Sequence, residues 1–316
     1  MRILVVVAGA TGGFYGARLL QAGRDVHYLV RPARAAALRE RGLQLVSPQG
    51  DATLQPPVWT VPEIAAPYDL VLLAVKAYAL EQAIEDLAAA VGPRTFILPV
   101  LNGMRHMDLL VARFGQDRVL GGVSQVAATV DESGRIVQLN ALQKLAYGRR
   151  QAAGPADPER LEVLHAAMSG AGFDARLSQD IDRDMWEKWV FLTTLGCINC
   201  LMRGTIGEVE AAPGGAALAR QMLAECAAVA GASGQPMTPA YMENTGRMMT
   251  TPGSPQASSM FRDLQRGLEV EADHIVGDML HRAQSFGLAT PLLAAAYANL
   301  CVYRNRRLAE AAKEQR

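Results

Sequence analysis

Short runs of β-branched and other apolar residues alternate with alanine-rich segments of helical period over the first part of the chain. The apolar runs predict four strands, at residues 2–7, 25–30, 70–75 and 95–100. The alanine-rich segments predict three helices, at residues 12–22, 34–40 and 78–91. Apolar strands that alternate with helices are typical of βαβ units around a buried parallel sheet. The pattern therefore predicts a doubly wound α/β domain.

A second group of strand-like segments follows, with turn residues after its first member. These segments lie at residues 118–130, 135–139 and 144–147. We expect them to form antiparallel strands that extend the same sheet. The domain is expected to close with a loop, a helix and a strand, at residues 149–158, 158–169 and 173–177.

From about Asp180 onward no strand-like alternation is visible, and helical segments fill the chain to its end. Segments rich in glycine, proline and serine separate these helices, at residues 212–215, 231–239 and 250–255. The chain is therefore expected to contain two domains, a doubly wound α/β domain at residues 1–179 and an all-helical domain at residues 180–316.

Composition and charge narrow the functions to consider. The chain has 31 Lys+Arg and 31 Asp+Glu residues and no long basic run, so a nucleic-acid partner is not expected. No apolar stretch is long enough to span a membrane and no cleavage signature follows the N-terminus, so we expect a cytoplasmic protein. The four cysteines are irregularly spaced and the five histidines lack metal-ligand spacing, which favours reduced thiols and no metal site. The residues leave the assembly open, with a homodimer among the alternatives.

A glycine-rich turn follows the first apolar run. Gly9 and Gly12 match the second and third glycines of a dinucleotide-binding fingerprint, whereas Val7 stands where the first glycine belongs. In such a turn the backbone amides and the helix N-terminus approach the pyrophosphate, because glycine has no Cβ to obstruct them. The candidate cofactor-binding residues of the turn are Gly9, Ala10, Thr11 and Gly12. An ordinary tight βα turn is the alternative interpretation.

Arg31 follows the second predicted strand, 19 residues after Gly12. Proteins that bind NAD carry an acidic residue near this position for the ribose hydroxyls, whereas an arginine suits the 2′-phosphate of NADP. Arg34 is expected to assist. A solvated surface arginine is the alternative, and the position after the second strand favours NADP.

The chain resembles the ketopantoate (2-dehydropantoate) 2-reductase family over nearly its whole length, including the glycine-rich turn. The matching segments are VVVAGATGGFYGARLLQAG, LAVKAY, LNGM, WEKW, GEV and SSMFRDLQRGLEVEADHIVGDMLHRAQSFGLATP. The resemblance implies a Rossmann-type doubly wound domain followed by an all-helical domain. It also implies the NADPH-dependent reduction of a small 2-oxo acid to a 2-hydroxy acid in a cleft between them, as in pantothenate biosynthesis.

The resemblance further implies roles for individual residues. Lys188 corresponds to the general acid, which protonates the keto oxygen while hydride arrives at the carbon. Glu271 corresponds to the carboxylate that closes the site and would hold the amine of Lys188 protonated. Ser259, with Lys188, corresponds to a substrate-binding residue. The further cofactor contacts that the resemblance implies are Lys76, Asn102, Ala128 and Glu271.

The sequence departs from the family at the residues expected to bind substrate. Leu192, Gly196 and Ile206 stand where the family has asparagines. The steps from Lys188 to Leu192 and Gly196 keep these positions on one side of a helix, so the face beside the acid has lost its amide donors. We therefore expect a roomier and more apolar pocket than one built for ketopantoate.

Three hypotheses follow from these observations. The first is a true 2-dehydropantoate 2-reductase. The second is a related NADPH-dependent reductase of another, bulkier or less polar 2-oxo compound. The third is a nucleotide-sensing protein without turnover, for which Val7 and the missing asparagines are the hints. The presence of Lys76, Lys188, Ser259 and Glu271 argues against the third, because a sensor needs no general acid.

Overall fold

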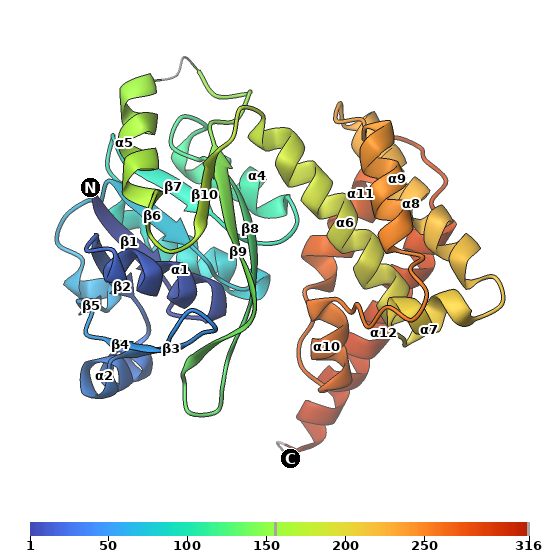
Figure 1. Ribbon diagram of the computed structural model, residues 1–316, viewed down its shortest axis with the longest axis horizontal. Helices are drawn as coiled ribbons and strands as arrows, with labels where there is room; N and C mark the ends of the chain where they lie inside the picture. The colour runs from blue at the N-terminus through green and yellow to red at the C-terminus, as the bar shows by residue number, and fades with distance from the viewer. Residues whose placement is uncertain (155–156, 315–316) are drawn as a thin grey trace. The chain divides into compact units, whose positions relative to one another are not determined.

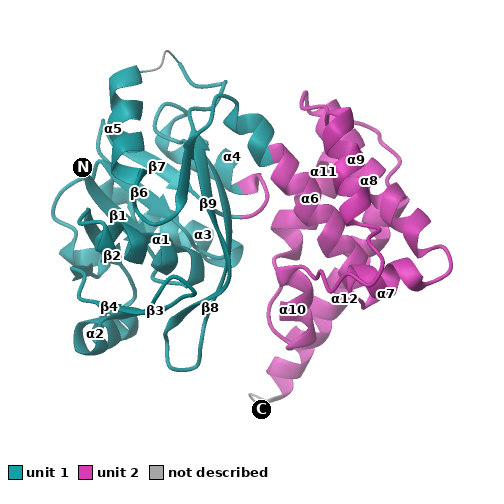
Figure 2. Cartoon of the chain, viewed as in Figure 1, with its two compact units in different colours: residues 1–101, 106–185 teal, residues 102–105, 186–316 magenta. Residues whose placement is uncertain are grey.

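The computed structural model describes residues 1–154 and 157–314 and divides the chain into two compact units (Figure 2). Unit 1 comprises Met1–Leu101 and His106–Met185, and unit 2 comprises Asn102–Arg105 and the chain from Trp186 onward. The division falls inside a single helix, α6 (Ile181–Met202), a few residues after the domain boundary expected from the sequence. Residues 155 and 156 of the expected loop, and the last two residues of the expected helical domain, lie outside the described residues.

A parallel sheet of five strands forms the centre of unit 1, in the order β5-β2-β1-β6-β7 (Figure 1). Its strands are β1 (Arg2–Val6), β2 (Asp25–Leu29), β5 (Val58–Trp59), β6 (Leu70–Leu73) and β7 (Phe96–Pro99). The four strands predicted from the apolar runs are confirmed, and the two-residue strand β5 is additional. All four residues of β6 are fully buried, as expected for a parallel strand covered on both faces. The strand order reverses between β1 and β6, so the topological switch point of the sheet lies at the carboxyl ends of these two strands.

The helices of unit 1 connect its strands. One of them, expected at residues 78–91, is shorter than the sequence pattern suggests. The helices are α1 (Ala10–Gln21), α2 (Pro32–Arg41), α3 (Leu80–Asp86), α4 (Arg105–Phe114) and α5 (Pro158–Met168). The helix expected at residues 78–91 is divided into α3 and two flanking 3-10 turns, at Ala77–Ala79 and Ala88–Ala90. The helix α4, whose first residue belongs to unit 2, was not predicted.

A second sheet of unit 1 corrects the expected arrangement of the antiparallel strands. It contains β3 (Leu43–Val46), β4 (Ala52–Leu54), β8 (Gly121–Val130), β9 (Ile136–Gly148) and β10 (Asp174–Leu177). The strand β9 pairs with β8, β3 and β10, so the hairpin does not extend the first sheet. The cause is the pair β3 and β4, which the sequence pattern did not predict and which supplies β9 with a partner. Within the described residues, one isolated bridge between Ile97 and Val119 links the two sheets.

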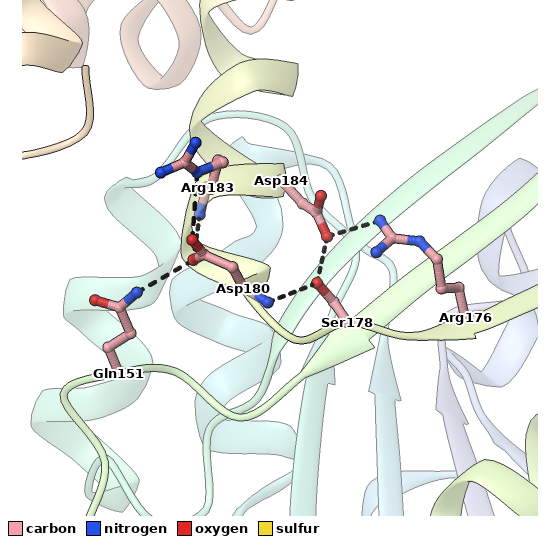
Figure 3. A network of polar contacts seen from close by, with 6 residues as sticks. All are labelled: Gln151, Arg176, Ser178, Asp180, Arg183 and Asp184. Carbon is pink, nitrogen blue, oxygen red and sulfur yellow. Dashed lines mark hydrogen bonds and ion pairs between the residues drawn. The ribbon is translucent and has the colours of Figure 1, made fainter. Parts of the chain in front are cut away.

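Polar side chains fix the start of α6, the helix that carries Lys188. Figure 3 shows the network formed by Gln151, Arg176, Ser178, Asp180, Arg183 and Asp184. The Asp180 carboxylate accepts the backbone amide of Arg183 at 3.2 Å, which is the hydrogen bond of a helix N-cap. The Arg176 guanidinium donates to the Asp184 carboxylate at 2.7 Å, and Ser178 donates to the same carboxylate. Acidic side chains in this first turn also stabilise the helix, because they interact favourably with the partial positive charge at its N-terminus.

Unit 2 is all-helical, as predicted. After α6 it contains α7 (Ile206–Ala211), α8 (Gly215–Ala232), α9 (Pro239–Met248), α10 (Ser259–Gln265), a π-helical turn (Asp273–Gly277), α11 (Asp278–Ser285) and α12 (Pro291–Glu314). The buried Glu225 on α8 accepts the amides of Leu292 and Leu293 at 3.3 and 2.9 Å, so its carboxylate caps α12. None of the helices in the described part of the chain combines the length and apolarity that crossing a membrane requires.

Candidate active site

The turn between β1 and α1 presents the backbone amides of a helix N-terminus. Gly9 is the N-cap residue of α1, and no side chain caps the helix there. No acidic residue lies in the first turn. The first amides of a helix have no intrahelical carbonyl partner and carry its partial positive charge, which makes the turn suitable for a phosphate.

The two fingerprint glycines have different surroundings. A Cβ on Gly12 would lie 2.7 Å from the carbonyl oxygen of Val7 and 2.9 Å from the Cβ of Ala74, so α1 packs against the exits of β1 and β6 only with glycine at this position. A Cβ on Gly9 would meet only a methyl of Val7, at 3.7 Å. The backbone of Gly9, with φ −86°, is open to any residue. Gly9 is therefore not required for folding, and the space in front of it is free for a ligand.

Val7 occupies the first glycine position of the fingerprint and keeps the backbone conformation of a glycine. Its φ is +71°, in the left-handed region that a β-branched residue rarely adopts. Its amide donates to the carbonyl of Leu29 at 2.9 Å, which extends the pairing of β1 with β2. The side chain is 39% exposed, with one methyl toward Gly9. Valine in place of the first fingerprint glycine therefore strains the backbone and places a methyl group beside the turn.

The two arginines after β2 have different environments. Arg31 is exposed and stands at the N-cap of α2, where its carbonyl accepts the amide of Ala35, while its guanidinium makes no hydrogen bond or ion pair with any described residue. The guanidinium of Arg34 donates to the carbonyls of Ala8 and Gly134, at 3.4 and 2.9 Å. Arg31 is therefore available for an anionic ligand, whereas Arg34 holds the glycine-rich turn between β1 and α1 against the β8–β9 hairpin.

Two further candidate cofactor residues of unit 1 follow structural irregularities. Lys76 is exposed at the start of the 3-10 turn after β6, and β6 pairs with β1, so Lys76 follows the strand beside the nucleotide turn. Ala128 lies on β8 directly after a register shift in its pairing with β9. Such a bulge changes the direction of the side chains that follow it. Lys76 thus lies just after a strand, and Ala128 lies within one, paired with Gln138 directly after the bulge.

Lys188 and Glu271 interact within unit 2. Lys188 lies on α6 and Glu271 directly before the turn that starts α11. Burial lowers the pKa of Lys188 from 10.5 to about 8, although the negative charge of Glu271 opposes this change and raises the pKa. An amine with this pKa is protonated at neutral pH and gives up its proton more readily than a solvated lysine. The pair therefore has the properties of a general acid and its supporting carboxylate.

The segment that carries Asn102 packs in unit 2 on the turn that follows Glu271. Gly103 has φ +82°, and a Cβ there would collide with the backbone carbonyl of His274. This close approach requires glycine and explains why residues 102–105 belong to the helical unit. The structure thus divides the candidate residues between the units. Unit 1 has Gly9, Ala10, Thr11, Gly12, Arg31, Lys76 and Ala128, and unit 2 has Asn102, Lys188, Ser259 and Glu271.

Asn199 fixes the backbone beside the candidate substrate serine. Ser259 is exposed at the first position of α10, and the N-cap residue is the buried Ser258. The amide of Ser258 donates to the side-chain oxygen of Asn199 at 2.8 Å, and the Asn199 nitrogen donates to the carbonyl of Gly204 at 2.8 Å. Asn199 is completely buried, so its amide cannot replace the missing substrate-binding asparagines. Sequence analysis did not predict this role, although a buried asparagine on a helix indicates a polar partner.

The three positions that lack asparagine have different surroundings. A Cβ on Gly196 would lie 2.6 Å from the terminal methyl of Met260, which therefore fills the space beside this glycine. Leu192 is half-buried on the same side of α6 as Lys188. Ile206 is completely buried, which makes it a core residue. The stripe of α6 that continues from Lys188 is thus apolar, and Met260 was not predicted to contribute to it.

The buried cysteines are poorly suited to redox chemistry. All four are free, and burial raises the pKa of the Cys200 and Cys226 thiols to about 12. Reactive cysteines require the thiolate, which such a pKa suppresses. The described residues contain no cluster of three or more histidine, cysteine or acidic side chains that could hold a metal ion.

Comparison with known proteins gives the family. The model of the family described as Ketopantoate reductase PanE/ApbA matches residues 3–151, and the model of its C-terminal part matches residues 180–303. A relative from Bacillus subtilis named Uncharacterized oxidoreductase YkpB is 35% identical over 303 residues, which are 96% of this chain and 99% of the relative.

Solved structures agree with this result. The crystal structure of a 2-dehydropantoate 2-reductase from Geobacter metallireducens is 30% identical, with a TM-score of 0.84, and covers 95% of this chain and 99% of its own. A ternary structure of D-mandelate dehydrogenase with NADH and anilino(oxo)acetate has a TM-score of 0.86 and covers 97% of this chain and 99% of its own. At 20% identity, this second similarity is one of fold. The chain is therefore an oxidoreductase of the ketopantoate reductase family.

Proposed function

We propose that this protein reduces a 2-oxo acid to the 2-hydroxy acid with NADPH. The observation that carries the proposal is the half-buried Lys188, whose pKa lies near 8 beside Glu271. A 2-oxo acid needs a proton at its keto oxygen when hydride adds to its carbonyl carbon, and Lys188 has a proton to give at neutral pH. The family membership supports the same reaction class.

The residues of unit 1 fit the phosphates of a dinucleotide. The uncapped first turn of α1 offers backbone amides, the space before Gly9 is open, and the exposed guanidinium of Arg31 has no partner among the described residues. We assign the pyrophosphate to Gly9–Gly12 and the 2′-phosphate of NADP to Arg31, with Lys76, Asn102, Ala128 and Glu271 as further cofactor contacts. When bound, the reduced nicotinamide supplies the hydride.

Lys188 then acts as the general acid. Its ammonium donates a hydrogen bond to the keto oxygen of the substrate and transfers the proton as charge develops there, which leaves a neutral amine. Glu271 favours the protonated form of the amine before the reaction, since its charge raises the pKa of Lys188. Ser259, exposed at the start of α10, is a hydrogen-bond donor for the substrate. A positioned acid of this kind contributes about 100- to 10,000-fold to the rate.

For the substrate, we favour a more apolar 2-oxo acid over ketopantoate. The specific observation is the methyl of Met260 in the space beside Gly196, together with Leu192 on the same stripe of α6. Such a surface offers no hydrogen bond to the hydroxyl of ketopantoate, and apolar pockets discriminate weakly between apolar side chains. Ketopantoate itself, with a place in pantothenate biosynthesis, is the second candidate, which the names of related proteins support.

The test is an assay of reduced-nicotinamide absorbance with a panel of 2-oxo acids that includes ketopantoate, branched aliphatic 2-oxo acids and phenylglyoxylate. We expect turnover with NADPH, and a loss of about two to four orders of magnitude in kcat for Lys188→Ala with NADPH binding preserved. Lys144→Ala, at an exposed lysine on β9, is the control. Near-normal turnover of Lys188→Ala would refute the assignment of the acid. NADPH binding without turnover on any substrate would favour the nucleotide-sensing alternative.

The remaining proposals concern the whole chain. We propose a nucleotide domain at residues 1–179 and a helical domain at residues 180–316, which the separate matches of the two family models support. We also propose a cytoplasmic homodimer. Light scattering of the purified protein measures its mass directly, and a mass of one chain would refute the dimer.

A further inference from the structure

A single buried carbonyl joins α6 to the segment that follows Glu271. The carbonyl oxygen of Ile275 accepts the indole N–H of Trp189 at 2.9 Å and the hydroxyl of Thr193 at 3.3 Å. The backbone amide of Ile275 donates to the carbonyl of Glu271 at 3.1 Å. The backbone of one residue, Ile275, thus connects the backbone of Glu271 to the side chain that directly follows Lys188.

This carbonyl belongs to a π-helical turn, Asp273–Gly277, between Glu271 and α11. Helices contain π turns rarely, and many of those known lie at functional sites. The two donors from α6 satisfy the carbonyl of this irregular turn away from solvent, since Trp189, Thr193 and Ile275 are all at least 96% buried. A buried indole N–H or hydroxyl without a partner is costly, so these bonds hold the two segments in one register.

The face of α6 that carries these donors is next to the face that carries the proposed acid. Trp189 and Thr193 are four residues apart, and so are Lys188 and Leu192, which means that each pair forms a stripe along the helix. The two stripes are rotated by about 100° from each other. A shift of the Ile275 carbonyl relative to α6 would therefore also change the distance between Lys188 and Glu271.

We propose that Trp189 and Thr193 are positioning residues, which set the separation of the Lys188 amine and the Glu271 carboxylate through the carbonyl of Ile275. The proposal rests on the function assigned above to Lys188 and Glu271. It assigns no contact with substrate to either residue. Their effect on the reaction passes entirely through the geometry of that pair.

The experiment measures the titration of Lys188 directly and without turnover. The chain has only four lysines, Lys76, Lys144, Lys188 and Lys313, so the protein labelled with 13C at lysine Cε gives a spectrum that Lys→Arg variants can assign. Among the described residues, Glu271 is the charged group that changes the pKa of Lys188. Thr193→Val keeps the shape of the side chain and removes its hydroxyl, and Trp189→Phe removes the indole N–H.

We expect the pKa of Lys188 to fall by about 0.5 unit or more in Thr193→Val and further in the double variant, because part of the one to three units that a close opposite charge contributes is lost. The control is Thr194→Val, the same change at the adjacent, equally buried residue, whose hydroxyl lies beside the Cys226 thiol. It should leave the titration unchanged. In the assay, kcat should fall about 10-fold in the double variant, with a smaller change in the KM for NADPH.

Two results would overturn the proposal. An unchanged Lys188 titration in folded Thr193→Val and in Trp189→Phe would show that both residues stabilise the unit without positioning the pair. An equal shift in Thr194→Val would show that any buried change on α6 has the same effect. Failure of the proposed function has a different signature, because it appears as normal turnover in Lys188→Ala, whatever the titration shows.

Discussion

Val7→Gly tests whether the nucleotide turn contains backbone strain. The substitution should remove the cost of a non-glycine residue at φ +71°, which is about 1–3 kcal/mol. Two losses oppose this gain. Glycine adds about 0.4–1 kcal/mol of unfolded-state entropy. The valine side chain is 39% exposed, so its partial burial contributes about 1 kcal/mol. The net change in the free energy of unfolding should therefore lie near zero, within about 1 kcal/mol of the unmodified protein.

Val6→Gly is the matched control. Val6 is the last residue of β1 and only 2% exposed, so the same substitution there relieves no strain and loses nearly the whole burial. The free energy of unfolding should fall by about 3 kcal/mol. Urea unfolding of both variants, followed by circular dichroism, measures the difference. NADPH affinity of Val7→Gly should be unchanged or tighter, because the methyl beside Gly9 is removed. A loss in Val7→Gly as large as that in Val6→Gly would refute the strain argument.

Three further predictions address cofactor, acid and substrate. Arg31→Ala should weaken NADPH by about 10- to 100-fold and leave NADH nearly unchanged in fluorescence titrations, whereas Arg34→Ala should weaken both because it releases the turn at Ala8; equal losses in Arg31→Ala would refute the 2′-phosphate site. The acid must be protonated, so kcat should be constant below the Lys188 pKa of about 8 and fall about 10-fold per pH unit above it, and Glu271→Gln should move this limb to lower pH; an upward shift would contradict the assigned pair. Gly196→Asn alone should not restore ketopantoate reduction because its side chain meets Met260, whereas Gly196→Asn with Met260→Ala and Leu192→Asn should raise kcat/KM for ketopantoate; a gain from Gly196→Asn alone would show that Met260 yields without cost.

The parallel sheet could be predicted because its signal is local. β6 and β7 are continuous apolar runs, β1 is one after Arg2, and the glycine-rich turn follows β1. The second sheet was misassigned because its pairing is not local. The partner of Ile136 on β9 is Leu45, about ninety residues away, and the strand that carries Leu45 has only four residues, too few for an alternating pattern to indicate it.

The residues proposed for the site came from the family resemblance, whereas the contacts that support them could not be predicted. Lys188 and Glu271 are 83 positions apart, and only the joint resemblance to the family connected them. The methyl of Met260 beside Gly196, and the Ile275 carbonyl between Trp189 and Glu271, depend on how the helices pack. A π-helical turn has no sequence signature comparable to a glycine-rich loop. These supporting contacts could therefore be identified only from the structure.

The arrangement of α6 separates anchoring from recognition, and this has an evolutionary consequence. Trp189 and Thr193 hold the helix to the Ile275 carbonyl, while Leu192 and Gly196 line the stripe beside the acid. Mutations on the second stripe can change the accepted substrate while the hydrogen bonds of the first stay intact. Under the proposed function, a lineage can thus explore new 2-oxo acids while Lys188 stays in place, and a directed library should vary residues 192, 196 and 260 while it keeps 189 and 193 constant.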